Sequence, residues 1–193
     1  MLIIISGMPG SGKSTVARHI SKKLKLDYVS AGGLFREIAE EKGYSNKGGK
    51  FVKWNEHVKL HPEIDKEIDK KIMKRARKGD VVVDSWLAGH LIKKADLKIF
   101  LKIDMNSAIE RITLREELTK KEVSSQTKHR LKVSEERWKK LYGVDINNLN
   151  PFDFVFDTTR FSQIQMKRII DLVLKSLLEN QNIKKVHTRR CEK

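Results

Sequence analysis

The sequence has one cysteine and no long apolar run. Cys191 alone cannot form an internal disulfide, and low cysteine use is typical of reducing compartments, so we expect a cytoplasmic location. No apolar segment approaches the roughly 18 residues of a transmembrane helix. The apolar N-terminus also lacks the basic residues that begin a signal peptide. We therefore expect neither a membrane span nor a cleaved leader.

Acidic residues are scarce relative to basic ones. The chain has 41 Lys and Arg against 25 Asp and Glu, a formal net charge of +16. Such an excess attracts nucleotides or nucleic acids, although the charged surface of a thermophilic protein has a similar composition. Aromatic residues make up only 7% of the chain, and single-strand platforms need them for base stacking. A nucleotide ligand is favoured, and any nucleic-acid contact is expected to be weak and electrostatic.

A complete phosphate-binding loop begins near the N-terminus. Residues 7–15 read G-M-P-G-S-G-K-S-T and match the pattern G-x-x-x-x-G-K-[ST]. Residues 2–6 form an apolar strand pattern before the loop, and a helical stripe that includes Val16 and Ile20 follows it. Strand, glycine turn and helix are the context that this motif requires. The sequence therefore predicts a nucleoside triphosphate site.

Each loop position has a physical role. Glycines let backbone N–H groups turn toward phosphate oxygens at a helix N-terminus, which stabilises anions. Lys13 supplies a charge for the β- and γ-phosphates, and the Ser14 hydroxyl is placed to hold Mg²⁺. A dinucleotide fingerprint is excluded because Thr15 stands where its third small residue should be. The predicted ATP-binding residues are Gly7, Met8, Pro9, Gly10, Ser11, Gly12, Lys13, Ser14 and Thr15.

Short apolar strands alternate with amphipathic helices along the chain. Residues 80–84 read D-V-V-V-D, a continuous apolar run of the kind found in parallel sheets covered on both faces. We predict a doubly wound α/β fold with the nucleotide at the carboxyl end of the first strand. Strands are predicted over residues 2–6, 27–30, 80–84, 97–101 and 152–156, and helices over residues 34–42, 62–78, 106–118, 134–142 and 162–178.

Two stretches do not fit this alternation. Residues 43–78 and 116–142 contain short helical segments, a weak one at 51–60 among them, and insertions across the mouth of a phosphate site are candidate lids. In the second stretch we predict a polar connection followed by a helix that begins with a cap at Ser134. Residues 180–193 lose apolar periodicity and are predicted to be a basic, flexible tail.

Missing motifs narrow the class of phosphate-loop protein. The guanine-binding motif N-K-x-D is absent, since two glycines follow Asn46 and Lys47. Hydrolytic motors usually place a glutamate after the strand-ending aspartate to orient water, but Ser85 follows Asp84. With no residue evident for activating water, phosphoryl transfer to another acceptor is favoured over hydrolysis.

Several arginines favour an anionic acceptor. Guanidinium groups match phosphoryl oxygens bidentately, and phosphoryl transfer depends on positioning and charge stabilisation. An acceptor phosphate is already an anion at neutral pH, so it needs no general base. It needs several cations, and it needs water to be excluded. The candidate cations are Arg36, Arg111, Arg115, Arg130 and Arg137.

Segments beyond the phosphate loop carry a resemblance. They are residues 29–36 (V-S-A-G-G-L-F-R), 62–65 (P-E-I-D), 87–89 (L-A-G), 95–99 (A-D-L-K-I), 134–135 (S-E), 142–146 (Y-G-V-D-I) and 157–159 (D-T-T). Together with the loop, and in order from residue 1 to about residue 178, they resemble the archaeal cytidylate kinases. These are nucleoside monophosphate (NMP) kinases of the P-loop NTPase superfamily.

The resemblance implies a reaction and an architecture. The γ-phosphate of ATP would pass to CMP or dCMP, giving the diphosphate and ADP, with Mg²⁺ as cofactor. The fold would be a five-stranded parallel sheet flanked by helices, with an NMP-binding insertion and a lid. A kinase domain is then expected at 1–179, with its core at 1–42, 79–115 and 143–179, the NMP-binding insertion at 43–78 and the lid at 116–142.

The resemblance also implies site residues. By position, Ser30 and Arg36 would lie at the acceptor nucleotide, Arg36 at its phosphate, and residues 158–161 near adenine. The expected lid residues are Arg111, Arg115, Arg130 and Arg137. The expected catalytic residues are Lys13, Arg115, Arg130 and Arg137, and Mg²⁺ is assigned to Ser14 and Asp84.

Few polar residues are placed to read the acceptor base. Relatives often carry arginine or histidine where this chain has Trp86, and bacterial cytidylate kinases have an aspartate near Leu87. Trp86 is either core packing or a wall that stacks on the base. Asp65 and Asp69, spaced i,i+4 on the helix that opens at Pro62, complete the predicted NMP-binding set, although both fit surface charges equally.

Two alternatives to a cytidylate kinase remain open. A kinase for AMP or UMP has the same phosphate chemistry, and these base-reading positions do not exclude it. An RNA-binding or RNA-modifying protein would explain the net charge of +16. For the kinase, we expect ATP and CMP or dCMP as the partners, and a monomer.

Overall fold

The computed structural model describes residues 1–44, 54, 57–58, 60–116 and 118–191, with side chains up to residue 179. These residues fall into two compact units, Met1–Thr159 and Arg160–Lys193. The first unit contains the phosphate loop and the described parts of both predicted insertions. The weak helix predicted at residues 51–60 lies largely outside the described residues.

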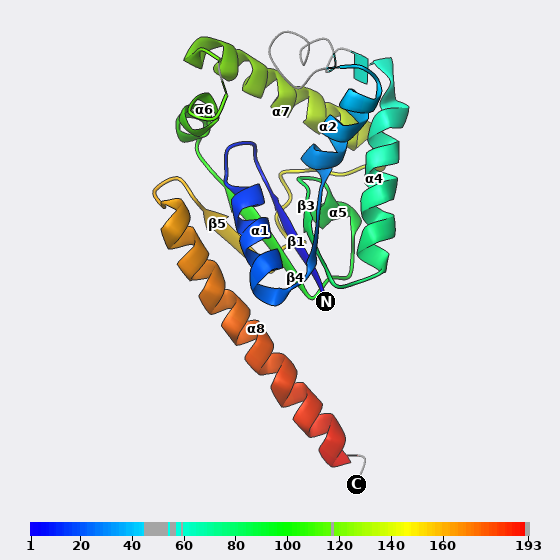
Figure 1. The fold of residues 1–193 in the computed structure, drawn as a ribbon, viewed down its shortest axis with the longest axis vertical. Coiled ribbons are helices and arrows are strands. Elements are labelled where there is room, and N and C mark those ends of the chain that lie inside the picture. The colour runs from blue at the N-terminus through cyan, green and yellow to red at the C-terminus, as the bar shows by residue number, and fades with distance from the viewer. Residues whose placement is uncertain (45–53, 55–56, 59, 117, 192–193) are drawn as a thin grey trace. The chain divides into compact units, whose positions relative to one another are not determined.

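The first unit is built around a five-stranded parallel sheet (Figure 1). The strands are β1 (Leu2–Gly7), β2 (Asp27–Ser30), β3 (Val81–Asp84), β4 (Leu97–Lys102) and β5 (Phe154–Asp157). Their spatial order is β2-β3-β1-β4-β5, so the connections change direction beside the central β1. Ligands of open α/β sheets bind at such a point, outside the carboxyl ends of the strands. The predicted fold class is confirmed.

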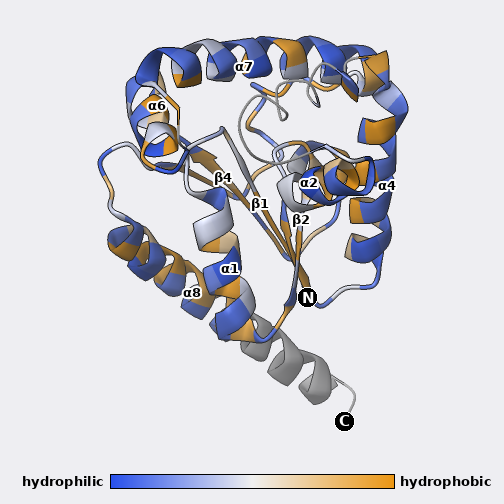
Figure 2. Cartoon of the chain, turned by 45° about the horizontal axis from the view of Figure 1, so that its top comes forward, coloured by the Kyte–Doolittle hydropathy of each residue, from blue (hydrophilic) through white to orange (hydrophobic). Residues whose placement is uncertain are grey.

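Helices cover the sheet and supply its apolar core. They are α1 (Lys13–Leu24), α2 (Ala31–Glu41), α4 (Pro62–Arg77), α5 (Ala88–Leu91), α6 (Met105–Thr113) and α7 (Lys120–Tyr142). Figure 2 shows the apolar strands between more hydrophilic helices. Ile64, Ile68, Ile72 and Ala76 form the buried stripe of α4, as predicted. Pro62 begins this helix, because its missing N–H is not needed in the first turn.

The predicted helix break before Ser134 is wrong. α7 is continuous from Lys120 to Tyr142, and Ser134 is buried in its interior. The helix begins after Thr119, whose hydroxyl accepts a hydrogen bond from the Glu122 N–H, while the Glu122 carboxylate accepts one from the Thr119 N–H at 2.8 Å. This capping box satisfies two N-terminal donors. No glycine or proline interrupts residues 120–142, so this polar segment forms a continuous helix although it lacks apolar periodicity.

α7 lies across the carboxyl ends of the strands and has a partly polar buried face. It extends from α6 toward α4 in Figure 1, and Figure 2 shows it as largely hydrophilic. Its buried residues are Val123, Thr127, Ser134 and Trp138. A helix that only covers a core buries an apolar stripe. Polar side chains on the inward face indicate that α7 covers a polar site.

The second unit consists mainly of α8 (Gln163–Cys191). A helix is predicted only to residue 178, but the helical backbone continues through most of the predicted flexible tail. The prediction depended on apolar periodicity, which indicates packing more directly than helix formation. None of the described helices combines the length and apolar character needed to cross a bilayer.

The start of α7 at Lys120 can be tested through its capping box. Thr119→Ala should lower the free energy of unfolding by about 1 kcal/mol, because it removes the side-chain acceptor at the start of the helix. Thr119→Ser keeps the hydroxyl and is the control. Chemical denaturation measures both variants. Equal stability of the alanine variant and the wild type would contradict a stabilising role for the cap.

Candidate active site

The phosphate loop, residues 7–12, is held by close packing. At Gly7, with φ of 140°, an added Cβ would lie 2.0 Å from the Leu101 carbonyl oxygen. At Gly10, with φ of 79°, it would lie 2.9 Å from the backbone of α6. Only glycine fits these conformations and contacts. The loop therefore has a fixed shape, and α1 begins directly after it.

Polar contacts close the loop from both sides. Lys13 Nζ donates to the Met8 carbonyl oxygen at 2.8 Å. The Thr158 hydroxyl, from the segment after β5, donates to the Ser11 carbonyl oxygen at 3.1 Å. The buried Ser11 hydroxyl has no hydrogen-bond partner among the described residues. A buried donor without a partner is costly, so the Ser11 hydroxyl is available to a ligand oxygen.

Asp84, at the end of β3, accepts hydrogen bonds from three hydroxyl groups. Its Oδ2 accepts from Ser14 Oγ at 2.6 Å, from Tyr28 Oη at 2.8 Å and from Ser30 Oγ at 3.4 Å. The sheet register places Ser30 opposite Asp84. Ser30 Oγ also accepts from the Gly33 N–H at 3.2 Å and caps α2. One carboxylate therefore connects the predicted ATP side with the predicted acceptor side.

Ser14 and Asp84 fit the predicted role in Mg²⁺ binding. Hydroxyl and carboxylate oxygens are the hard ligands that this ion prefers. Within the described part of the chain, no group of three or more His, Cys, Asp or Glu side chains could hold a metal. An ion at this position would therefore take its other ligands from phosphate and water, which is usual for Mg²⁺ in phosphoryl transfer.

Cations converge beside the loop. Burial lowers the pKa of Lys13 to about 8; Asp84 acts in the opposite direction, and the charges of Arg130 and Arg115 lower it further. Arg115 itself pairs with Glu116 at 2.7 Å on the surface. A lysine held close to other cations is poorly stabilised in its charged form. Such a group is ready to bind anions, which restore its charge.

Arg130 connects this cluster with the rest of α7. Desolvation lowers its pKa, Glu116 opposes this, and the charges of Arg115, Arg137 and Arg36 lower it further. Arg130 is nevertheless an exposed residue of α7, so its guanidinium is open to a ligand. Arg36, an exposed residue of α2, is thus within electrostatic range of the cluster from the acceptor side.

Arg111 contacts the segment after β5. It belongs to α6, and its guanidinium donates to Thr158 Oγ1 at 3.2 Å and to the Thr158 carbonyl oxygen at 2.7 Å. The Thr159 carbonyl oxygen accepts a further bond at 3.3 Å. These contacts fix the segment after β5, which in turn contacts the phosphate loop. This arrangement supports a positioning role for Arg111.

Arg137 is paired with a predicted base-reading residue. Its Nη1 lies 2.7 Å from Asp65 Oδ2, and both side chains are largely buried. Its Cζ lies 5.8 Å from the centre of the Trp138 ring. Burial raises the pKa of Asp65, and the charge of Arg137 opposes this rise. The structure therefore joins α7 to α4 through two residues that are 72 positions apart (137 minus 65).

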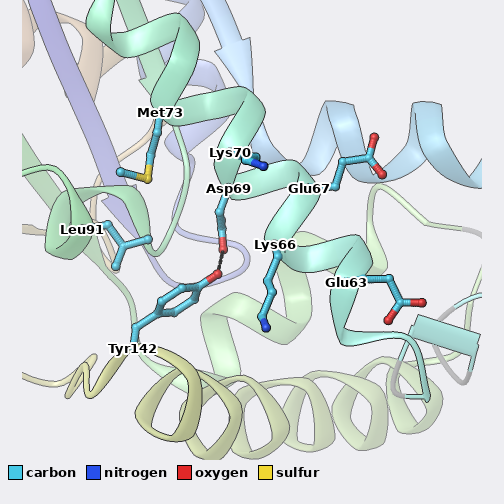
Figure 3. A pocket seen from close by; sticks show the side chains of 8 residues that line it. All are labelled: Glu63, Lys66, Glu67, Asp69, Lys70, Met73, Leu91 and Tyr142. Atoms are coloured by element: carbon cyan, nitrogen blue, oxygen red, sulfur yellow. Dashed lines mark hydrogen bonds between the residues drawn. The ribbon is translucent and has the colours of Figure 1, made fainter.

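Asp69, one turn along α4, has a different partner. Its Oδ2 accepts a hydrogen bond from Tyr142 Oη at 2.7 Å (Figure 3). Burial raises the pKa of Asp69 to about 6, with the Tyr142 bond acting against the rise and the Asp65 charge adding to it. The pair lies in an open groove of about 480 Å³. The groove is lined by Glu63, Lys66, Glu67, Asp69, Lys70, Met73, Leu91 and Tyr142.

Trp86 and Leu87 pack in a small apolar cluster. The Trp86 ring meets the Trp138 ring edge to face, with centroids 5.1 Å apart. Leu87 and Ile146 complete the buried part of the cluster. Trp86 Nε1 has no hydrogen-bond partner among the described residues. Trp86 thus packs against Trp138, the ring that lies next to the Arg137 guanidinium. Base stacking by Trp86 remains a prediction.

Sequence reasoning missed three residues of the site: Tyr28, Trp138 and Tyr142. Tyr28 alternates with Ser30 along β2 and reaches the same carboxylate. That period of two was a usable signal. Trp138 and Tyr142 follow Arg137 on α7, but their contacts depend on a helix that was predicted to be broken.

Comparisons with known proteins identify the family. Residues 2–160 match the profile of the "Cytidylate kinase-like family". A cytidylate kinase of Pyrobaculum neutrophilum is 35% identical over 187 residues, which cover 96% of this chain and 99% of that protein. A cytidylate kinase of Methanothrix thermoacetophila is 39% identical over 164 residues, which cover 84% of this chain and 91% of that protein.

Solved structures agree on the fold alone. An uncharacterized protein from Eubacterium ventriosum has a TM-score of 0.64 at 15% identity, covering 92% of this chain and 98% of its own. A shikimate kinase from Bacteroides thetaiotaomicron has a TM-score of 0.57 at 13% identity, covering 91% and 98%. The fold is therefore shared with proteins that are only distantly similar in sequence.

The lowered pKa of Lys13 predicts proton uptake on ATP binding. With a pKa of about 8, Lys13 should be uncharged in about half of the free protein at pH 8, and bound phosphates should restore the charge. Calorimetry in buffers of different ionisation enthalpy should show uptake of about half a proton at pH 8 and little at about pH 7. Lys13→Arg, which stays charged, is the control. Equal uptake by both proteins would assign the proton to another group.

The raised pKa of Asp69 predicts a stabilising substitution. The folded protein holds the Asp69 proton more tightly than the unfolded chain does. The protonated carboxyl group therefore contributes fully to folding stability below pH 3.8, and this contribution is lost as the pH rises through about 6. Asp69→Asn should therefore raise the free energy of unfolding by about 1–2 kcal/mol at about pH 8, and by less at about pH 5. Denaturant unfolding at both pH values checks this; a less stable variant at the higher pH would contradict it.

Proposed function

The chain belongs to the cytidylate kinase-like family, and we propose on this basis that it transfers the γ-phosphate of ATP to CMP or dCMP, giving CDP or dCDP and ADP. The observation that best supports this proposal is the cation cluster at the phosphate loop. Lys13, Arg115 and Arg130 act on one another there, and the partly polar face of α7 covers them. A loop for one triphosphate does not by itself need so many cations. Two phosphorylated nucleotides do.

The cations explain how two anions can react. An oxygen of the acceptor phosphate attacks the γ-phosphorus, the new P–O bond forms, and the bond to the bridging oxygen breaks with its electrons leaving on ADP. The attacking oxygen is already deprotonated at neutral pH, so no general base is required. Lys13, Arg115 and Arg130 offset the repulsion and the charge on the transferring group. α7 would exclude water from the reaction.

The acceptor is proposed to bind between β2, α2 and α4. Ser30 hydrogen-bonds to Asp84 beside Ser14, which places the end of β2 next to the phosphate loop. Arg36 follows on α2, within electrostatic range of Arg130. These contacts support assigning Arg36 to the acceptor phosphate and Arg130 to the transferring group.

Ser14 and Asp84 would hold Mg²⁺, and the ion would supply charge neutralisation for phosphoryl transfer. We propose a cytoplasmic monomer, on the single cysteine and the expected small-molecule substrates. The net charge of +16 supports weak electrostatic contact with nucleic acid, and no other observation favours an RNA-binding function.

Assaying ADP release with AMP, CMP, UMP, GMP and their deoxy forms tests the proposal. CMP and dCMP should give the highest kcat/KM. Lys13→Met should lose about 10²-fold or more in kcat, because it removes charge stabilisation from the transition state. The melting temperature of that variant verifies its fold. A preference for AMP would overturn the acceptor assignment, and near-normal turnover by Lys13→Met would overturn the role of the loop in catalysis.

A further inference from the structure

The buried ion pair between α4 and α7 is poorly explained by stability. Arg137 and Asp65 keep only 24% and 12% of their side-chain surface exposed, with 2.7 Å between Nη1 and Oδ2. Desolvating two charges often costs more than their attraction returns, and apolar residues of similar volume can do as well or better. A buried pair that joins the two segments predicted to bind substrate is therefore better explained by a binding role.

Both partners have unused hydrogen-bonding capacity. Among the described residues, Arg137 Nε has no hydrogen-bond partner, and Asp65 Oδ2 lies 2.7 Å from Arg137 Nη1 without a well-aligned hydrogen bond. A guanidinium carries five N–H donors, and an ionised carboxylate accepts at both oxygens. The pair thus presents an acceptor group beside a fork of donors. Trp138, close to the guanidinium, limits the orientations of Arg137.

We propose that Asp65 and Arg137 together read the base of the acceptor nucleotide and select cytosine over uracil. The assignment rests on the proposed function. Cytosine presents its N4 amino donor next to the acceptors N3 and O2, so a carboxylate can accept from N4 while the guanidinium donates to N3 and O2. Uracil has the acceptor O4 in place of the amino group and the donor N3–H in place of the N3 acceptor. Its O4 would therefore face the carboxylate, and its N3–H would face the N–H groups of the guanidinium. Such mismatches leave buried polar groups unpaired.

The assignment divides the inner face of α7 between two ends of one ligand. Arg130 affects the charge of Lys13 at the phosphate loop, whereas Arg137 contacts Asp65. Seven residues of helix separate the two arginines by about 10 Å, which is the scale of a nucleoside monophosphate. One helix face can therefore contact the phosphate with Arg130 and the base with Arg137.

Asp69 supplies a matched control. It lies one turn after Asp65 on α4, and it is also a largely buried aspartate with a raised pKa. Its carboxylate, however, accepts a hydrogen bond from Tyr142 and lines a groove that none of the cations at the phosphate loop lines. The structure therefore distinguishes the two aspartates that the sequence left equivalent.

The test is the ratio of kcat/KM for CMP to that for UMP, measured by ADP release at saturating ATP. Asp65→Asn should lower this ratio by about 10-fold or more, because an amide can donate to O4 of uracil. Arg137→Gln should lower it by weakening CMP more than UMP. Asp69→Asn should lower the ratio by less than Asp65→Asn does, because the Asp69 carboxylate already accepts a hydrogen bond from Tyr142. Arg130→Lys should reduce turnover with both nucleotides equally, since it acts at the phosphate end.

Melting temperatures show which variants are folded, and Asp65→Glu, which keeps but displaces the charge, replaces Asp65→Asn if that variant does not fold. A wild-type ratio in a folded Asp65 variant would overturn the assignment. Equal losses with CMP and UMP in Arg137→Gln would also overturn it and would place Arg137 at the phosphoryl group. A wild-type protein that phosphorylates AMP and neither pyrimidine would overturn the proposed function, and the base assignment with it.

Discussion

The arrangement of the site depends on one buried carboxylate at the end of β3. Asp84 pairs in register with Ile5 of β1 on one side and with Ser30 of β2 on the other. Its Oδ2 accepts hydrogen bonds from Ser14 and Ser30, so it connects the start of α1 with the cap of α2. A buried carboxylate is stable only when its acceptors are satisfied. The need to satisfy Asp84 therefore fixes the distance between the loop for the triphosphate and the segment proposed for the acceptor.

α7 is the second element on which the site depends. It covers the charged residues beside the phosphate loop, so its buried face is only partly apolar. Thr127 and Ser134 take buried positions that a core-covering helix would give to apolar residues, which removes part of the usual driving force for packing. Directional contacts replace it. The capping box fixes the first turn, and Tyr142 binds Asp69 at the last. A helix held mainly at its ends, with polar residues between them, can adjust to a ligand at lower cost than one packed along its length.

The sheet was predictable from sequence, because each strand is a short apolar run next to a glycine or a carboxylate. β2 begins and ends at the predicted residues, and the buried stripe of α4 is the predicted one. α7 was not predicted as one helix, because its sequence has little apolar periodicity. A signal was nevertheless available. Thr127, Arg130, Ser134 and Arg137 recur at the three- and four-residue spacing of a single helix face. The pattern is helical in polar residues rather than in apolar ones.

The roles of the arginines could not be predicted, because their partners decide those roles and the partners are distant in sequence. Arg111 binds the carbonyl groups of Thr158 and Thr159 and so fixes a loop. Arg137 faces Asp65, which belongs to the other predicted insertion. Desolvation lowers the pKa of Arg130, Glu116 opposes this, and three further arginines add to the lowering. Three arginines that share a face or a spacing thus differ in how much of their charge is already compensated. The least compensated guanidinium has the most to gain from a phosphoryl group, whereas one paired with a carboxylate is better suited to a neutral base.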